Sequence, residues 1–590
     1  MRLAAFAVDF DGTLTRDGRL GSDVRDAIAS VRERGVKVIL VTGRRLDDLF
    51  RSAGNVDCFD AVVAENGAVL HFPGRGQTIP LAPAPAAVFL DELRRRSIAF
   101  DVGASVVETD ASCAPSVIDA IRALQQPLVI IFNRGRLMAL PPAVAKSTGL
   151  QRALWTLRLS LHNTIGIGDA ENDHDLLAAC EIGAAVAWGS PPLLAAADEV
   201  IDGDGPSAVG RYLIEAAGRP RLATARLAHR SLLLGREHRG DPIRLAIRGR
   251  SILITGEPGT GKSWLAGLLC EQLILQGYSL AVVDPEGDYG SLAALPGVIH
   301  LGGTDGPPSA RELSRIFQHP DASAVIDLSK LEHADKVSYV RGVMPLLNRL
   351  RRQNGLPHKI LLDEVHYFPS DVGEPDLFDA ELAGYILVTY RSSTLAPGVC
   401  GVPDTIALAL RETDAAEIAS LAAARVPQAD LTSLATLLSG LRADEGVLLP
   451  GPDEAHGQAR RFVVASRLTE HVRHRSKYLD MPVSDALAFS FGAPDQPRPR
   501  ARSLKEFTGF LTSMPPDRLD PYLLRHDFSR WLGEVFRDRS LAQHVREIET
   551  GRVAADAGAA IAQAIRARYD TTPNALTGNF AGTADSSPNR

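Results

Sequence analysis

The chain has 590 residues, of which 45% are hydrophobic, 23% charged and 6% aromatic. It is too long for one compact domain and too hydrophobic for a mostly disordered chain, so we expect two to four folded domains. The 64 Lys and Arg residues against 71 Asp and Glu residues give a net charge of -7. This balance excludes a general excess of positive charge for binding nucleic acid, so any such contact must be local.

The cysteines and the hydropathy pattern indicate in which cellular compartment the protein is expected. The five cysteines lie far apart and form no CxxC pair, which argues against a disulfide framework or a zinc site. Acidic residues interrupt the N-terminal sequence MRLAAFAVDFDG before a signal sequence could form. No stretch approaches the roughly 20 apolar residues of a membrane span. We therefore expect a cytoplasmic protein with no membrane contact.

The first part of the chain, residues 1–215, alternates short apolar runs with amphipathic stretches such as Ser22–Arg34. This alternation predicts βαβ units around a parallel sheet. The predicted strands are Leu3–Val8, Val36–Val41, Ala61–Ala64, Leu128–Phe132 and Thr164–Ile167.

A glycine-punctuated, basic stretch from about Gly218 to Gly240 predicts a boundary, and a second βα series follows it. Its predicted strands are Ser251–Thr255, Leu280–Val283, Ala324–Leu328, Lys359–Leu362 and Tyr385–Val388. Phe507 to Tyr569 then has the spacing of amphipathic helices. We expect an α/β domain at 1–215, a linker at 216–229, a second α/β domain at 230–466, a helical domain at 467–570 and a disordered tail at 571–590.

The first motif with a chemical meaning is Asp9-Phe10-Asp11-Gly12, at the end of the first predicted strand. Two carboxylates at i and i+2 lie on the same side of an extended chain. One aspartate there can attack phosphorus while the other protonates the leaving oxygen. The pair alone is also compatible with a metal site or a solvated turn.

Three further motifs follow in order: Thr42-Gly43-Arg44 after the second strand, Lys146, and Gly168–Asp173 after strand Thr164–Ile167. Ligands of open α/β sheets bind at the carboxyl edge of the strands, where these motifs would gather. In this order the set resembles the haloacid dehalogenase (HAD) phosphatases over residues 1–215. The chain holds only eight lysines, so a lysine at this position is unlikely to arise by chance.

The resemblance implies a role for each residue. Asp9 would be the nucleophile, Asp11 the acid and base, and Thr42 a donor to the phosphate. Lys146 would neutralise the phosphate and the nucleophile. Mg²⁺ would be held by Asp9, by the backbone carbonyl of Asp11 and by Asp169, with Asn172 and Asp173 supporting the metal and the lysine.

Glu65-Asn66-Gly67-Ala68, and the length of chain between Thr42 and Lys146, are similar to the Cof-type, sucrose-phosphate-phosphatase-like branch (HAD-IIB). That branch implies a small α/β cap, here at about residues 80–140, and phosphate monoesters, sugar phosphates first, as substrates. The cap is short, which predicts an open site. A turn with Asn133, Arg134 and Arg136 could reach a substrate anion or simply face solvent.

The second constellation is the sequence GEPGTGKS, at 256–263, between a predicted strand and a predicted helix. This is the P-loop pattern GxxxxGK[ST] in its required context. Its glycines (Gly256, Gly259 and Gly261) let the backbone amides face phosphates, Lys262 reaches the β- and γ-oxygens, and Ser263 joins Mg²⁺. Asp363 and Glu364 end a later apolar strand. Asp363 would bind Mg²⁺ through water and Glu364 would activate the attacking water.

Three segments of residues 230–466 resemble the HerA/FtsK group of RecA-like ATPases: Val283–Tyr289, Asp363–His366 and Thr389–Ser392. The resemblance implies that Thr389 senses the γ-phosphate and that the chain forms rings, such as a hexamer, on DNA. The N-terminal barrel of HerA has no counterpart here. Arg391 and Arg411 are candidates for an arginine finger, although a surface or salt-bridge role is the favoured interpretation of each.

The C-terminal part of the chain contains fewer motifs that indicate a function. A basic stretch near Tyr478 (Arg467, His471, Arg473, His474, Arg475 and Lys477) could bind a phosphate backbone, although Glu470 and Asp480 dilute its charge. An exposed helix face is the alternative. Phe528, Trp531 and Phe536 recur at helical spacing, which predicts core packing.

Two functions fit these motifs. In the first, the chain is a bifunctional enzyme, an Mg²⁺-dependent phosphatase for a small-molecule phosphate ester joined to a P-loop domain that binds and hydrolyses ATP. The P-loop domain would then be a regulatory or assembly module whose nucleotide state controls access to the phosphatase site. In the second, it is a nucleic-acid-directed HerA-like ATPase, or a polynucleotide kinase, whose HAD domain removes terminal phosphates. Glu364 argues against the kinase and the net charge against nucleic acid.

Overall fold

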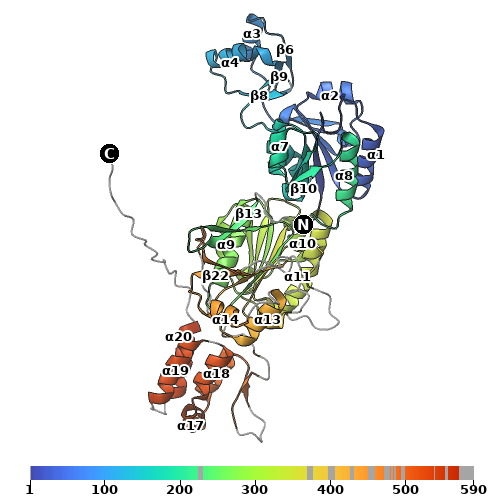
Figure 1. Ribbon diagram of the computed structural model, residues 1–590. Helices are drawn as coiled ribbons and strands as arrows, with labels where there is room; N and C mark the ends of the chain where they lie inside the picture. Colours follow the sequence, from blue (N-terminus) through green and yellow to red (C-terminus); the bar gives the residue numbers. More distant parts are fainter. Residues whose placement is uncertain are drawn as a thin grey trace, which may run out of the picture.

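The computed structural model describes residues 2–569 except 134, 223–229, 369–376, 380, 396–404, 426–430, 450–458, 471–478, 480–482, 484–486, 493–498, 537 and 552–555. The predicted tail at 571–590 lies outside the described residues. A small sheet, two large sheets and a group of C-terminal helices follow one another along the molecule (Figure 1). Among the described residues, no helix is both long and apolar enough to cross a membrane.

The first sheet has eight strands in the order β12-β11-β10-β1-β2-β3-β4-β5, and we refer to the part built on it as the N-terminal domain. All of its neighbours are parallel except β3-β4 and β4-β5. Its strands are β1 (Ala5–Asp9), β2 (Lys37–Val41), β3 (Ala61–Ala64), β4 (Val69–Phe72), β5 (Gln77–Pro80), β10 (Thr164–Gly168), β11 (Ile182–Val186) and β12 (Glu199–Ile201). Its helices are α1 (Ser22–Glu33), α2 (Leu46–Ala53), α5 (Lys146–Thr156), α6 (His174–Ala179), α7 (Pro191–Ala196) and α8 (Pro206–Gly218).

A separate four-stranded antiparallel sheet, in the order β6-β7-β9-β8, lies between β5 and α5 in the sequence. Its elements are α3 (Ala87–Arg95), β6 (Phe100–Val102), β7 (Val107–Asp110), α4 (Ala114–Ala123), β8 (Val129–Asn133) and β9 (Arg136–Leu140). Figure 1 shows this small sheet and its two helices beyond the first sheet, at one end of the molecule. It forms a lid-like unit with its own buried core around Phe89 and Leu137.

One expectation for this region is wrong. Arg136 does not lie on a turn but begins β9, and its guanidinium forms ion pairs with Asp101 (3.0 Å) and Glu108 (2.9 Å). Its charge is therefore already neutralised within the small sheet. The side chains of Asn133 and Arg134 lie outside the described residues.

The second sheet has eleven strands in the order β14-β13-β23-β22-β21-β15-β20-β19-β16-β18-β17, and we refer to the part built on it as the P-loop domain. The strands from β21 to β17 in this order are parallel, and β22, β23, β13 and β14 extend the sheet in antiparallel pairs. The parallel strands are β15 (Ser251–Thr255), β16 (Leu280–Asp284), β17 (Val298–Gly302), β18 (Ser323–Asp327), β19 (Lys359–Leu362), β20 (Tyr385–Thr389) and β21 (Thr405–Ala409). The others are β13 (Ser231–Arg236), β14 (Pro242–Ala246), β22 (Glu445–Leu449) and β23 (Arg460–Val464).

The helices of the P-loop domain are α9 (Lys262–Leu275), α10 (Ala310–Ile316), α11 (His333–Asn354), α13 (Ala415–Arg425) and α14 (Leu431–Ser439). All five strands predicted for this domain are present, with ends shifted by at most one residue. They are central strands covered on both faces, and such strands have continuous apolar runs that sequence reading detects well.

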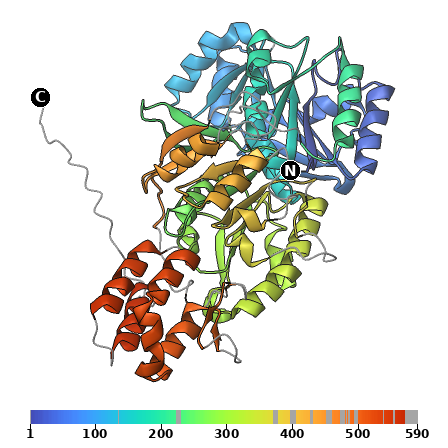
Figure 2. The same cartoon turned by 60° about the horizontal axis from the view of Figure 1, so that its bottom comes forward.

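The C-terminal part is helical, as predicted, apart from the short pair β24 (Phe489–Ser490) and β25 (Arg500–Ala501). Its helices are α16 (Leu504–Ser513), α17 (Pro516–Leu524), α18 (Asp527–Val535), α19 (Arg539–Gly551) and α20 (Ala557–Tyr569), and Figure 2 shows them grouped beside the P-loop domain. Phe528, Trp531 and Phe536 are buried in a cluster of aromatic rings, which confirms the prediction of core packing.

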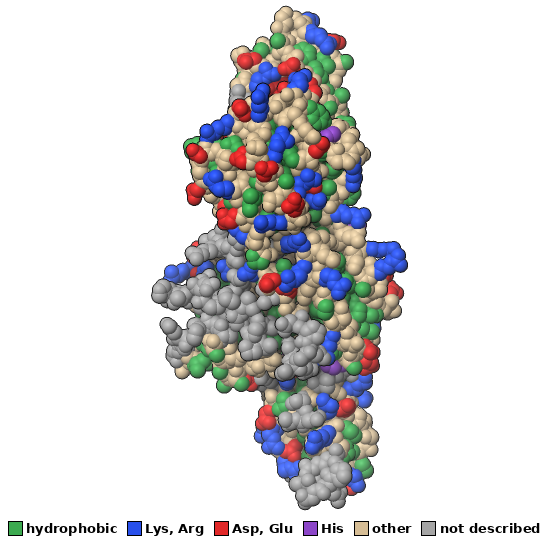
Figure 3. Space-filling view, turned by 90° about the vertical axis from the view of Figure 1, so that its right-hand side faces the viewer, with side chains coloured by type: hydrophobic (Ala, Val, Ile, Leu, Met, Phe, Trp, Pro, Cys, Tyr) green, Lys and Arg blue, Asp and Glu red, His purple; other side chains and the backbone are tan. Residues whose placement is uncertain are grey.

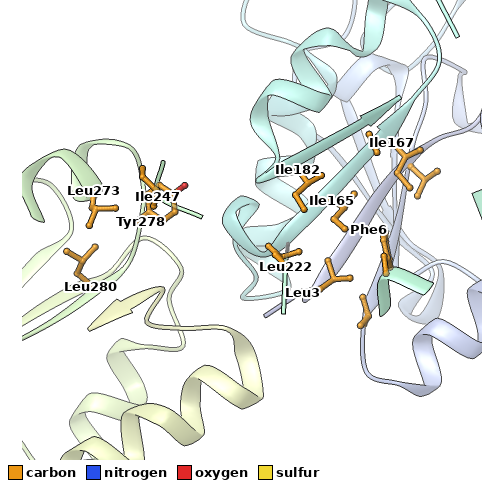
Figure 4. Packing of buried hydrophobic residues seen from close by; sticks show 14 of the residues in the cluster. Leu3, Phe6, Ile165, Ile167, Ile182, Leu222, Ile247, Leu273, Tyr278 and Leu280 are labelled. Atoms are coloured by element: carbon orange, nitrogen blue, oxygen red, sulfur yellow. The ribbon is translucent and has the colours of Figure 1, made fainter. Parts of the chain in front are cut away.

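The two large domains meet through a buried polar joint. His162 of the N-terminal domain stacks on Tyr278 of the P-loop domain, with ring centroids 3.7 Å apart. Glu181 accepts hydrogen bonds from both, at 3.0 Å from His162 Nδ1 and 2.8 Å from the Tyr278 hydroxyl. Asn163 Oδ1 lies 3.0 Å from His358 Nε2. Buried hydrophobic residues flank this joint on both sides (Figure 4). Separating the domains would replace these buried hydrogen bonds with hydrogen bonds to water and would expose the surrounding hydrophobic residues.

The joint lies at the amino ends of strands in both sheets. The backbone carbonyl of Asn163 accepts from Ala4, just before β1, and His358 immediately precedes β19. The carboxyl ends of β1 and β19, at Asp9 and Asp363, therefore lie at the far ends of strands that start from the joint. The two sets of predicted site residues point away from each other.

Lys359, the first residue of β19, supplies a test of this buried region. Its Nζ donates to the backbone oxygens of Ile247 and Arg250, both at 2.8 Å, and burial lowers its pKa to about 7. Above pH 7 the unfolded chain still binds a proton that the folded chain has lost. The free energy of unfolding should therefore increase between pH 7 and 8.5, by up to about 1.4 kcal/mol per pH unit. Urea unfolding of Lys359→Met should lack this slope, and the same slope in both proteins would contradict the assignment.

Candidate active sites

The first candidate site lies at the carboxyl ends of β1 and β10. Lys146, the first residue of α5, is buried and its Nζ donates to Asp9 Oδ1 and Asp173 Oδ1, both at 2.6 Å. Oxygens of Asp9, Asp169 and Asp173 lie within 4.8 Å of one another. Segments up to 164 residues apart in the sequence thus form one cluster of three acids and one base. The structure brings together four of the predicted site residues here.

Two glycines, Gly67 after β3 and Gly149 in α5, let α5 pack closely against the loop after β3. This packing positions Lys146 beside Asp9. Gly67 has a φ of 104°, and a Cβ built on it would lie 1.9 Å from the carbonyl oxygen of Ala145, the residue before Lys146. A Cβ on Gly149 would lie 2.5 Å from the Cα of Gly67. No side chain could be accommodated at either position without moving the helix. This contact explains the Gly67 of the Glu65-Asn66-Gly67-Ala68 segment.

The electrostatics of the cluster suit a cation. Burial and the Asp173 carboxylate raise the pKa of Asp9 well above its ordinary value, and Lys146 opposes both effects. Burial would lower the pKa of Lys146, but Asp173 and Asp9 outweigh it and raise that pKa. Three buried carboxylates against one lysine leave net negative charge, and carboxylate oxygens are the ligands that Mg²⁺ prefers. The donor set therefore fits Mg²⁺.

Asp173 is engaged on both oxygens. Its Oδ1 accepts from Lys146, and its Oδ2 accepts from the backbone N–H groups of Asp169 (3.1 Å) and Ala170 (3.2 Å). These contacts fix the loop after β10 and aim Lys146 at Asp9. They favour a positioning role for Asp173, with Asp9 and Asp169 left as the more direct metal ligands.

Asp11 is not among the three clustered acids, and its side chain contacts Arg44. Arg44 holds it with two hydrogen bonds, Nε to Oδ2 at 2.7 Å and Nη2 to Oδ1 at 2.6 Å. Thr42 is buried at the end of β2, and its Oγ1 accepts from the backbone N–H of Arg44 at 3.1 Å. Sequence analysis gave Thr42 a role and missed that of Arg44. The Thr42-Gly43-Arg44 motif offered only a partial signal: it put Arg44 three residues after the end of β2, at the predicted ligand edge of the sheet, but did not identify Asp11 as its partner.

Sequence analysis also did not predict that Glu65 links the small sheet to the first sheet. Its carboxylate accepts from the backbone N–H groups of Ala104 (2.9 Å) and Ser105 (3.0 Å), which connect β6 to β7 of the small sheet. Arg45 lies 3.9 Å from Glu108 of the same sheet. These contacts tie the small sheet to the loops that follow β2 and β3, beside the Asp9 cluster.

The second candidate site lies at the carboxyl ends of β15 and β19. The glycines of the loop between β15 and α9 have positive φ angles of 147° (Gly256), 80° (Gly259) and 99° (Gly261). Such angles let successive backbone amides face one ligand. Lys262 Nζ donates to the carbonyl oxygens of Gly256 and Glu257, both at 3.0 Å, and thus lies over the loop. The loop fits the phosphates of a nucleotide.

The acidic residues of this site come from β19. Asp363 is buried, and its Oδ2 lies 3.5 Å from the Ser263 hydroxyl, so that the two predicted Mg²⁺ ligands of this domain are neighbours. Glu364 adopts a left-handed backbone conformation with φ 45°, which is unfavourable for a glutamate. This conformation turns the chain sharply just after the strand.

His366 connects Glu364 to Thr389. Its Nδ1 lies 3.6 Å from Glu364 Oε2 and 3.2 Å from Thr389 Oγ1, and its ring packs edge-on against Tyr390. The predicted water-activating residue and the predicted sensor therefore contact the same imidazole ring. Sequence analysis included His366 in a motif but gave it no role.

The described contacts of the Val283–Tyr289 segment are structural ones within the P-loop domain. The carboxylate of Asp284, at the end of β16, accepts four backbone N–H groups, at 2.8 to 3.3 Å, from residues 286–289. Glu286 pairs with Lys336 of α11 at 3.1 Å. This segment shapes the edge of the sheet near Asp363.

The remaining arginine candidates have other contacts. The Arg391 side chain lies over the ring of Tyr390, at 5.1 Å from its centroid, whereas Arg411 is exposed and its backbone carbonyl accepts from the N–H of Glu257 in the P-loop. Arg467 is not part of an exposed basic surface, because it is mostly buried over Trp264 and donates to Thr469. The other basic residues of that stretch, and Tyr478, lie outside the described residues.

Comparison with known proteins finds a family match in each of the two large domains. The family model described as haloacid dehalogenase-like hydrolase matches residues 6–95 and 120–213, and the model described as Helicase HerA, central domain, matches residues 241–349. A phosphoglycolate phosphatase from Methanothermobacter thermautotrophicus is 30% identical over 215 residues, which are 34% of this chain and 91% of that protein. The chain belongs to the haloacid dehalogenase-like hydrolases, and its second domain is of the HerA central-domain type.

Other relatives match the same N-terminal region. A phosphoglycolate phosphatase from Archaeoglobus fulgidus is 28% identical over 216 residues, which are 36% of this chain and 94% of that protein. A solved HAD subclass IIB sugar phosphatase is 17% identical, with a TM-score of 0.31, and the match covers 35% of this chain and 98% of that structure. The predicted combination of a HAD-type domain, a P-loop domain and a helical C-terminal part is confirmed.

Proposed function

We propose that the chain is a bifunctional enzyme. Residues 1–215 would hydrolyse phosphate monoesters with Mg²⁺ through an aspartyl-phosphate, and residues 230–466 would bind and hydrolyse ATP. The observation that carries the phosphatase half is the buried contact of Lys146 with both Asp9 and Asp173, beside Asp169. In this proposal Asp9 is the nucleophile, Lys146 its counter-cation and Asp169 a metal-binding carboxylate, and the closeness of the three side chains supports these roles.

The reaction can be written for the residues of this chain. A carboxylate oxygen of Asp9 attacks phosphorus while the bond to the ester oxygen breaks, and Asp11 donates a proton to that oxygen. Asp11 then removes a proton from water, which attacks the phosphorus of the aspartyl-phosphate, releases inorganic phosphate and restores Asp9. Lys146 and the backbone after Thr42 offset the charge of the phosphoryl oxygens. When bound, Mg²⁺ supplies further positive charge beside Asp9 and Asp169.

The substrate is proposed from the relatives. Those described above are named phosphoglycolate phosphatases, so phosphoglycolate joins sugar phosphates as a first candidate. The test is phosphate release from phosphoglycolate, sugar phosphates, nucleotides and end-phosphorylated oligonucleotides, with Mg²⁺ and with EDTA. Release from a small monoester that stops in EDTA supports the proposal. Release from oligonucleotides alone would favour the nucleic-acid-directed alternative.

For the P-loop domain, Lys262 and Ser263 would contact the phosphates and Mg²⁺ of ATP, Asp363 would bind that Mg²⁺ through water, and Glu364 would activate water, with Thr389 sensing the γ-phosphate. The match to the HerA central domain keeps the nucleic-acid-directed ring as a second candidate. ATP turnover that rises with DNA or RNA, together with a hexamer-sized species, would favour it. Turnover indifferent to nucleic acid, from a monomer, would exclude it.

Arg44 provides a test of the phosphatase geometry. Arg44→Ala should lower kcat/KM about tenfold to a hundredfold, because Asp11 loses the two hydrogen bonds that orient its carboxylate. Arg44→Lys should recover only part of the loss, since lysine cannot form the paired contact. Arg51→Ala is the matched control, because Arg51 lies on the adjacent helix α2 and is exposed. Equal kinetics for Arg44→Ala and Arg51→Ala would contradict the role of Arg44.

A further inference from the structure

A cleft of about 320 Å³ lies where the N-terminal domain meets the P-loop domain, at a distance from both candidate active sites. Basic side chains line one wall and amide side chains the other: Arg2, Lys37 and Arg158 face Gln318, Gln353 and Asn354. Arg2 and Lys37 lie at the amino ends of β1 and β2, whereas Asp9 ends β1 on the opposite edge of the sheet.

The charge of this cleft is positive and largely uncompensated. The Arg2 guanidinium donates to the carbonyl oxygen of Gln353 at 3.0 Å, and that of Arg158 donates to the side-chain oxygen of Gln318. Neither arginine forms an ion pair with a carboxylate in the described part of the chain. Lys37 donates to Asp60 at 3.0 Å, but no Asp or Glu is among the lining residues. Figure 3 shows Lys and Arg side chains gathered on this side of the molecule where the two domains meet.

We propose that this cleft is a binding site for a small phosphate-bearing anion, such as pyrophosphate or a phosphate ester. Its volume is within the range of small-molecule sites, about 300 to 1,000 Å³. Arginine is the side chain best suited to phosphate oxygens, which it can contact through two N–H groups. The lining contains no aromatic ring, so it offers no surface on which a nucleobase would stack.

A bound anion would contact both domains. Arg2 and Arg158 already reach across the seam to Gln353 and Gln318, and a phosphate group between them would add charged hydrogen bonds on both walls. A ligand that binds only the assembled pair of domains stabilises that pair. The site would thus let a phosphorylated metabolite fix the N-terminal domain on the P-loop domain without entering either active site.

The test is isothermal titration of the full chain with inorganic pyrophosphate in EDTA, which removes the metal that the two active sites would use. One pyrophosphate per chain is expected, with at least tenfold weaker binding to the double variant Arg2→Ala/Arg158→Ala and to Gln353→Glu, which places a carboxylate in the cleft. Arg152→Ala is the matched control, because Arg152 is an exposed arginine of α5 that does not line the cleft. It should bind as the unaltered chain does.

Two further variants separate this site from the active sites. Asp9→Asn and Lys262→Ala should both retain the binding, whatever their effect on catalysis. Unchanged affinity in Arg2→Ala/Arg158→Ala and in Gln353→Glu would overturn the proposal, as would loss of binding in Asp9→Asn or Lys262→Ala. Displacement of pyrophosphate by a short single-stranded oligonucleotide would overturn the assignment to a small anion. Melting temperatures of the free variants close to that of the unaltered chain confirm that they fold.

Discussion

Replacing Asp9 with asparagine is expected to abolish phosphatase activity, with kcat reduced about 10⁴-fold or more. Asparagine has nearly the same shape but cannot act as the nucleophile that forms the aspartyl-phosphate. Because burial and Asp173 disfavour the charged form of Asp9, removing this charge should not lower the melting temperature measured without Mg²⁺. The measurement is phosphate release from the best monoester substrate, alongside thermal unfolding of both proteins.

The same variant reports on the independence of the two sites. The two sites point away from the joint between the domains, so Asp9→Asn should leave ATP turnover within about twofold of the unaltered chain. Phosphatase activity that survives Asp9→Asn would remove Asp9 from the mechanism. ATP turnover that falls in parallel would mean that the two sites are coupled through the joint.

Glu364→Gln should have the second largest effect, a decrease of ATP turnover by about 10² to 10³-fold with nucleotide binding retained. Glutamine preserves the size of the side chain beside His366 but cannot accept a proton from the attacking water. The measurements are steady-state ATP hydrolysis and the affinity for ATP by titration. Phosphatase kinetics of the same variant should be unchanged.

The control for Glu364 is Glu312→Gln in the same domain. Glu312 is exposed, and its carboxylate accepts from the backbone N–H and the hydroxyl of Ser309 at the start of α10, a contact that glutamine can also make. Its ATP turnover should match that of the unaltered chain. If both variants hydrolyse ATP at the normal rate, Glu364 is not the activating base.

Much of the fold could be predicted because the central strands of both sheets are buried on both faces. Strand Lys359–Leu362, for example, is predicted and observed with the same ends, since its continuous apolar run leaves few alternatives. Two antiparallel strands at the edge of the second sheet, β13 and β14, were not predicted. Their sequences alternate buried and exposed residues over a short length, and β13 lies in the stretch whose glycines and arginines indicated a boundary, with β14 directly after it.

The candidate sites could be predicted where a residue type at a fixed position in a motif has one chemical use. Asp9, Lys146 and Lys262 are of this kind. Arg44 and His366 could not be assigned, because their roles depend on contacts with Asp11 and with Thr389 that only the folded chain brings together. Arg136 was misplaced for the same reason, since Asp101 and Glu108 are opposite it only in the small sheet.

The joint between the domains could not be predicted from the sequence. His162 and Tyr278 are ordinary core residues in the sequence, and only the packed domains show that they stack and share Glu181. This contact joins the two large domains at the ends of their sheets opposite to the candidate sites. Because the two candidate sites point away from each other, direct transfer of a product from one site to the other is disfavoured.

The most direct test of the central claim is to trap the covalent intermediate. The chain is mixed with excess phosphoglycolate or another accepted monoester in Mg²⁺, quenched in acid within one turnover, and the peptide containing Asp9 is analysed by mass spectrometry. The account predicts a phosphoryl group on Asp9 that is absent from Asp9→Asn and unaffected by Lys262→Ala. Rapid phosphate release with no phosphoryl group on Asp9 would contradict it.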